Sequence, residues 1–118
     1  SEAAFNPPVV VKVVPAQQGR IYFIDRGLGA NIKVGDVLNV FRSVALKVGS
    51  RQAQPERIFL GTMAITDSEA GVSLGRFTPD EGVKANPLIR MKTPVKDDLV
   101  IPNDTPPRKW TPSRGNCG

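Results

Sequence analysis

The acidic side chains are the first candidates for chemistry in this chain, because a pair of carboxylates is the simplest acid–base machinery. Asp25 with Asp36 forms one such pair, and Asp67 with Glu69 forms another. All four are expected at turns or strand ends, where Asp in particular is favoured for structural reasons. The sequence therefore predicts no catalytic residue, and we do not expect an enzyme.

The histidine and cysteine content removes further chemistry. The chain contains no His and a single Cys, Cys117, so it has neither a His–Cys dyad nor a cluster of metal ligands. Cys117 is either an incidental thiol or one half of a disulfide, formed with another molecule or with a further part of the precursor. The run Gly27-Leu28-Gly29 lacks the further Gly and the helix of a nucleotide-binding loop. We expect no cofactor and no metal.

The composition indicates one small β-rich domain. The 118 residues are 40% hydrophobic and 23% charged, with 11 Gly and 11 Pro, which favours many short elements separated by turns. No run approaches the roughly 18 apolar residues of a membrane span. The N-terminus lacks the basic and apolar regions of a signal peptide, so we expect a piece of a longer precursor.

Alternating β-branched and aromatic residues between turn residues predict a small, partly open antiparallel β-barrel of about six strands with extended termini. The barrel is expected over residues 9–102, between an extended segment 1–8 and a Pro-rich flexible tail 103–118. A further strand piece within Val44–Val48 and a short extended piece within Pro94–Pro102 are also expected. The strands are expected at Val9–Val14, Arg20–Asp25, Val37–Arg42, Ile58–Thr66, Val72–Phe77 and Leu88–Lys92.

Turn residues between these strands are expected to be structural. Glycine adopts backbone conformations that other residues avoid, and Asp favours turns. Ile32 and Val34, between two of these turns, are expected to plug the end of the barrel. The structural turn residues are Gly19, Gly27, Gly29, Gly35 and Asp36.

Residues 29–38 recur loosely as residues 80–89. Ile32-Lys33 matches Val83-Lys84, whereas Asn86-Pro87 replaces Gly35-Asp36. Each copy is expected to bend the chain into a strand and to place its apolar residue against the end of the barrel. A chance similarity between two turns is the alternative.

A pattern of Gly-led strands and Gly-Asp bends runs through most of the expected barrel. It consists of Gly19, Ile24-Asp25, Gly27, the run Ile32 to Asp36, Leu60-Gly61 and Asp67 to Ser73. On these residues, the sequence from Val9 to Lys92 resembles the C-terminal domain of the flagellar assembly protein T family and similar small barrels of bacterial envelope proteins. The resemblance implies an SH3-like, non-catalytic barrel in the periplasm or cell envelope, which helps to build or anchor an assembly by binding a protein partner.

The long connection Ser43–Arg57 is the best candidate for a contact with that partner. This stretch has four basic residues and one acidic residue, Glu56. The basic residues are Arg42, which lies beside the connection, and Lys47, Arg51 and Arg57 within it. A solvated basic loop without a partner is the alternative, since rim loops of barrels vary without affecting the core.

Nucleic-acid binding is the second hypothesis for function. The net charge of +5 favours contact with phosphates. The basic residues are spread along the chain, however, and most aromatic residues fall in strand patterns typical of a core. Only Tyr22 and Trp110 are expected to be free to stack on a base or to contact a partner.

Overall fold

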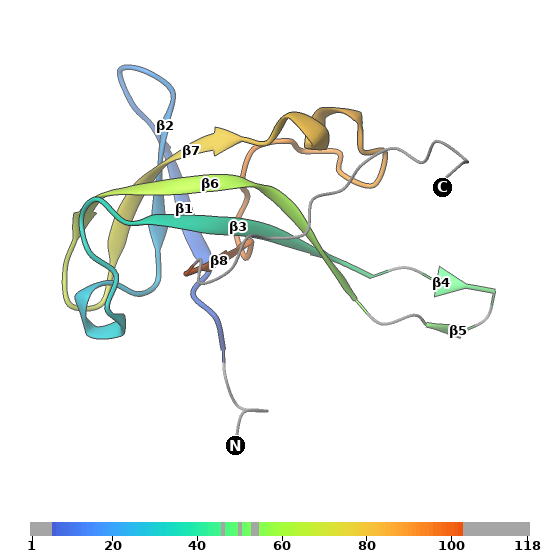
Figure 1. Ribbon diagram of the computed structural model, residues 1–118, viewed down its shortest axis with the longest axis horizontal. Helices are drawn as coiled ribbons and strands as arrows, with labels where there is room; N and C mark the ends of the chain where they lie inside the picture. Colours follow the sequence, from blue (N-terminus) through green and yellow to red (C-terminus); the bar gives the residue numbers. More distant parts are fainter. Residues whose placement is uncertain (1–5, 46, 50, 53–54, 103–118) are drawn as a thin grey trace, which may run out of the picture.

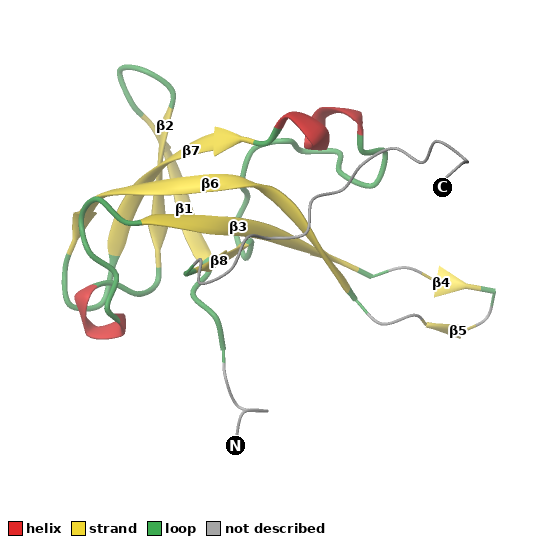
Figure 2. Ribbon diagram, viewed as in Figure 1, coloured by secondary structure: helices red, strands yellow, loops and turns green. Residues whose placement is uncertain are grey.

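The computed structural model describes residues 6–45, 47–49, 51–52 and 55–102, with the backbone alone at 47, 48, 51 and 52. It confirms the all-β class and the partly open barrel: six antiparallel strands curl into a half-barrel (Figures 1 and 2). Their order in the sheet is β1-β2-β7-β6-β3-β8. The strands are β1 (Val10–Pro15), β2 (Arg20–Ile24), β3 (Val37–Val44), β6 (Glu56–Ser68), β7 (Ser73–Pro79) and β8 (Leu99–Ile101).

Two short strands, β4 (Lys47–Val48) and β5 (Arg51–Gln52), form a separate antiparallel pair. Within the described residues, the helical content consists of two 3-10 segments, η2 (Leu28–Ala30) and η3 (Glu81–Ala85). They lie at opposite ends of the sheet (Figure 2). Both are too short to form a layer of their own, so the sheet supplies its own core by curling.

The core lies on the concave face of the sheet. In β3, Leu38 and Val40 are buried, and their partners Met63 and Val100 are fully buried. Leu38 and Val40 point to the same face, as residues two apart in a strand do, and Asn39 between them is also buried. The members of the buried cluster are Val10, Tyr22, Ile24, Ile32, Leu38, Val40, Ile58, Leu60, Met63, Ile65, Val83, Ile89 and Val100.

Irregularities in the strand pairing help the sheet to curl, because a β-bulge bends its strand and increases the local twist. In the β3–β6 pair, Val40 lies opposite Gly61 but Phe41 lies opposite Phe59, so Leu60 is the extra residue. Gly61 has φ +154°, and a Cβ there would lie 2.1 Å from the Thr78 carbonyl oxygen. Glycine is therefore required at this bend.

The two edges of the sheet meet at one seam. Val9 forms an isolated bridge with Leu99. The Val10 amide donates to the Asp98 carbonyl (2.9 Å), and the Val100 amide donates to the Pro8 carbonyl (2.8 Å). This seam joins β1 to β8 over a few residues, so the barrel closes there and stays open elsewhere.

The bend after β2 rests against the turn between β6 and β7. The amides of Leu28 and Gly29 donate to the carbonyls of Glu69 (2.6 Å) and Ala70 (2.9 Å). At Gly27, a Cβ would lie 2.0 Å from the Glu69 carbonyl oxygen. The absence of a side chain there is what allows the two backbones to approach.

One predicted strand is wrong. Residues 88–92 form turns and bends, and β8 at Leu99–Ile101 is the last strand. The Asn86 Oδ1 accepts from the Leu88 amide (2.8 Å), and the Lys92 ammonium donates to the Asn86 (3.1 Å) and Ile89 carbonyls. These local bonds fold the segment back on itself and compete with an extended strand.

Of the two residues expected to plug the end of the barrel, Ile32 is buried and Val34 is not. Ile32 is 1% exposed, but Val34 is 64% exposed. Val34 occupies the outside of a turn in which the Asp36 amide donates to the Lys33 carbonyl (3.0 Å), so its side chain faces solvent. Val83, the counterpart of Ile32 in the second copy of the motif, is likewise 1% exposed, although that copy does not lead into a strand.

Candidate functional site

The connection Ser43–Arg57 is folded as a projecting β-hairpin, which we call the arm. Ser43 pairs with Arg57 and Val44 with Glu56 as β3 and β6 continue past the barrel. Farther out, β4 and β5 pair through Lys47–Gln52 and Val48–Arg51. Figure 1 shows this ribbon extending well beyond the rest of the sheet. The expected strand piece within Val44–Val48 is thus present as the end of β3 and as β4.

The arm is basic. It carries Lys47, Arg51 and Arg57 against Glu56. Arg57 is exposed, and it forms no ion pair with any other described residue. For Lys47 and Arg51 the pairing of β4 with β5 fixes the backbone position. The arm therefore offers cations on a strand-paired backbone, which can attract an acidic surface.

Arg42 does not belong to that basic surface. Its guanidinium binds Asp98 in a bidentate manner, with Nε to Oδ1 at 2.9 Å and Nη2 to Oδ2 at 2.7 Å. It also donates to the carbonyls of Met91 (2.6 Å) and Thr93 (3.1 Å). The side chains of Arg42 and Asp98 are 16% and 4% exposed, respectively. The donors of Arg42 fasten β3 to the loop before β8, so Arg42 has a structural role, and its contact with a partner stays a prediction.

Tyr22 is not free to stack, contrary to expectation. It is 3% exposed and belongs to the core, where its ring meets Phe77 edge-on at a centroid distance of 6.2 Å. Its position in β2 opposite Gly75 of β7 leaves room for the ring beneath the sheet. Trp110, the other aromatic residue expected to be free, lies outside the described residues.

The predicted structural residues lie at bends. Gly19 and Gly35 have φ of +72° and +95°, which favour glycine. A Cβ on Gly29 would lie 2.9 Å from the Ala70 carbonyl oxygen. Asp36 accepts from the Lys33 amide through Oδ2 (2.8 Å). The contacts of Gly27, Gly29 and Asp36 shape the end of the barrel opposite the arm, whereas Gly19 lies in the turn between β1 and β2.

Two of the four carboxylates considered for catalysis, Asp25 and Asp36, bind backbone amides. Asp25 Oδ1 accepts from the Val9 amide (2.9 Å), and the Asp25 amide donates to the Val9 carbonyl (3.1 Å). Asp25 and Asp36 thus each hold a backbone turn or crossing. In the described part of the chain, no three Cys, Asp or Glu side chains gather where they could hold a metal ion.

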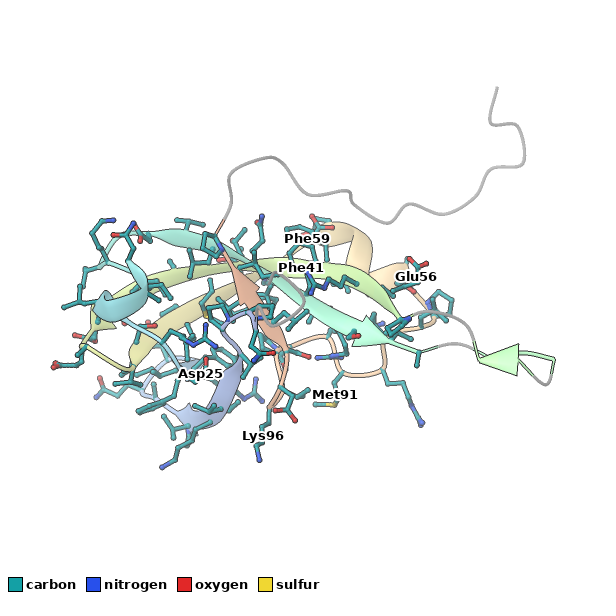
Figure 3. All side chains as sticks on the ribbon, turned by 90° about the horizontal axis from the view of Figure 1, so that it is seen from below. Asp25, Phe41, Glu56, Phe59, Met91 and Lys96 are labelled. Carbon is teal, nitrogen blue, oxygen red and sulfur yellow. The ribbon has the colours of Figure 1, made fainter. Side chains whose placement is uncertain are left out.

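A second surface feature escaped the sequence analysis. Phe41 and Phe59 lie side by side on the outer face of the sheet, with ring centroids 5.7 Å apart (Figure 3). Next to Phe59, a hollow of about 120 Å³ opens between β6, β7 and the start of η3. The bulge at Leu60 and the turn at Asp80 create it, and no local pattern of residues signals such a place.

No family model, curated protein or solved structure matches the chain. Among the described residues, no helix has the length and apolar character required to cross a membrane.

Proposed function

We propose that this chain is a non-catalytic binding module whose arm contacts a protein partner. One observation carries the proposal: the arm is strand-paired, yet it lies outside the core. Ser43, Ala45, Gly49, Pro55, Glu56 and Arg57 are exposed, and Val44 alone among the described arm residues packs against the core. A paired ribbon loses less conformational entropy on binding than an open loop does.

The setting that we propose is an assembly of the bacterial cell envelope, with the domain in the periplasm. The support for this is the resemblance between the bends of this chain and those of the flagellar assembly protein T barrel. The bends at Gly27 and Gly35 close the end of the sheet opposite the arm. In this proposal the barrel holds the arm in place, and the arm supplies the specificity.

The test compares two triple variants of equal charge change. Lys47→Ala, Arg51→Ala, Arg57→Ala removes the cations of the arm, and Arg20→Ala, Lys33→Ala, Lys96→Ala removes three exposed cations elsewhere. Each immobilised chain is offered proteins extracted from a bacterial envelope. Three exposed ion pairs contribute in sum about 1.5 kcal/mol, so the arm variant should retain partners roughly tenfold more weakly. The control variant should retain them as the unmodified chain does.

Identical capture by both variants would remove the arm from consideration. The nucleic-acid alternative is supported by the excess of cations on the arm, and it predicts binding to a DNA duplex that weakens steeply with salt. Titration of the chain with an unrelated duplex at low ionic strength tests this alternative, because the absence of binding under those conditions would exclude it.

A further inference from the structure

The outer face of the sheet carries apolar side chains that the core does not use. In β2, Tyr22 and Ile24 belong to the core cluster, so Phe23 between them points to the outer face. Its cross-strand partner, Leu74 of β7, points the same way. Both side chains are partly exposed, so this apolar pair is accessible from outside the barrel.

The apolar surface extends beyond this pair. Val14 of β1 pairs with Ile21 of β2 on the same face, and both are partly exposed. Arg76, two residues along from Leu74 in β7, pairs with the exposed Ala64 of β6. We call this surface the outer patch, and it consists of Val14, Ile21, Phe23, Ala64 and Leu74.

Two opposite charges flank the outer patch in one row. Lys12 of β1 pairs with Phe23, Phe23 with Leu74, and Leu74 with Asp67 of β6. The row therefore reads cation, apolar, apolar, anion across four adjacent strands. Lys12 and Asp67 are exposed, and neither forms an ion pair with another described residue. Both charges are thus available to a partner.

We propose that a second copy of this chain covers the outer patch, face to face, in a symmetric dimer. A two-fold axis that lies between the copies and parallel to the strands reverses the order of the row. Lys12 of each copy then faces Asp67 of the other. At the centre, Phe23 of each copy faces Leu74. The row is therefore complementary to itself, as a two-fold interface requires, whereas a partner of one charge sign would meet like charge at one end.

The side chains around the row suit this arrangement. Packed sheets lie about 10 Å apart, and the convex curvature of the outer face increases that separation at the ends of the row, where the long Lys12 side chain lies. Its Nζ is 5.8 Å from the centroid of the Phe23 ring, so the cation leans over the patch. Arg76 donates to the Gln18 carbonyl, which draws its guanidinium toward the turn between β1 and β2 and away from the row.

The expected contact area is small. Four strands at about 4.8 Å and five residues at about 3.3 Å give roughly 300 Å² per copy, below the roughly 800 Å² of a stable interface. We therefore expect a weak dimer, half formed at about 0.1 mM and monomeric at about 1 µM. Such a contact acts where copies are held close together in an assembly, and it leaves the arm free.

Sedimentation equilibrium between about 1 µM and about 1 mM measures this association. Lys12→Glu and Asp67→Lys each place like charges at both ends of the row, so each should weaken the dimer at least about tenfold. An equal mixture of these two variants should restore it, because every end of the row then joins a carboxylate to an ammonium. Lys96→Glu, the same change at an exposed position outside the patch, should leave the dimer unchanged.

The unmodified chain would overturn the proposal by staying monomeric up to about 1 mM. So would a mixture of Lys12→Glu and Asp67→Lys that sediments as the two variants do alone, with both folded by circular dichroism. Association that survives Lys12→Glu but is lost on replacing the cations of the arm by Ala would place the interface on the arm instead. The capture of envelope proteins by the arm is measured separately, so either proposal can fail without the other.

Discussion

Arg42 on β3 and Arg57 on β6 occupy adjacent residue pairs of the ladder, Arg42 with Ile58 and Ser43 with Arg57. Neighbouring pairs face opposite sides of a sheet. Arg42 therefore points to the concave side, where Asp98 and two carbonyls receive its donors. Arg57 points to the other side and is exposed. The face on which each arginine lies decides whether it is structural or available to a partner.

This difference gives a prediction for stability. Arg42→Gln should lower the free energy of unfolding by about 2–4 kcal/mol, because it leaves the buried Asp98 carboxylate without its cation. The matched change Arg57→Gln should alter it by less than about 0.5 kcal/mol. Urea denaturation followed by circular dichroism measures both values. Equal effects would mean that the Arg42–Asp98 pair does not hold the last loop in place.

At the scale of elements, the arm extends a barrel that is complete without it. Most of its described residues are exposed, and the ladder between Val37 and Arg42 on one strand and Ile58 and Ala64 on the other continues independently of β4 and β5. The arm is therefore the part of this fold in which length and sequence can change at the least cost in stability.

Replacing residues 46–54 by Asn-Gly tests this separation. Asn-Gly favours the tight turn of a short hairpin, so the shortened chain should keep its stability within about 1 kcal/mol. It should also lose the capture of envelope proteins that depends on Lys47 and Arg51. Thermal unfolding and the pull-down are the two measurements. A shortened chain that is unfolded, or one that captures the same proteins, would contradict the assignment of binding to the arm.

The elements that the sequence predicted are those with local signals. Val37–Arg42 and Ile58–Thr66 are runs of β-prone residues between turn residues, and both lie within strands of the structure. The closing strand was misplaced at Leu88–Lys92, whereas the short extended piece expected within Pro94–Pro102 contains β8 (Leu99–Ile101). Asp98 distinguishes them, since its bonds to Arg42 across 56 residues of sequence anchor the second segment beside β3.

As with the strands, the parts of the candidate site that have local signals in the sequence were predictable, and the others were not. The cations of Ser43–Arg57 are visible in the sequence, and so is the hairpin. The roles of Arg42 and Tyr22 depend on which face of a strand meets the core, and a shift of one residue reverses that face. The hollow beside Phe59 depends on a bulge and a turn that meet only in the folded chain.

At the scale of the whole molecule, the barrel has many hydrogen-bonded residue pairs in the centre of the sheet and few where its two edges meet. β3 and β6 share eight residue pairs, whereas a short seam of hydrogen bonds from Pro8, Val10, Asp98 and Val100 closes the two edges. A structure of this kind opens locally where few bonds must break, at a lower free energy than global unfolding.

Hydrogen exchange should reveal this order. We expect the amides of Val10 and Val100 at the seam to exchange at least about tenfold faster than those of Leu38 and Met63 in the centre of the sheet. Exchange measured residue by residue by NMR provides the rates. Equal rates at the seam and the centre would indicate that the barrel opens only as one unit.

The seam also sets how such a domain can be built into a larger polypeptide. Because Pro8 and Val100 are bonded directly, the chain enters and leaves at neighbouring points. A host protein can therefore accept the domain as an insertion in a surface loop without separating the two flanks of that loop. For the same reason the order of the strands can be circularly permuted. A short linker would join the flanks of the barrel near Pro8 and Val100, and the new ends would lie in the arm.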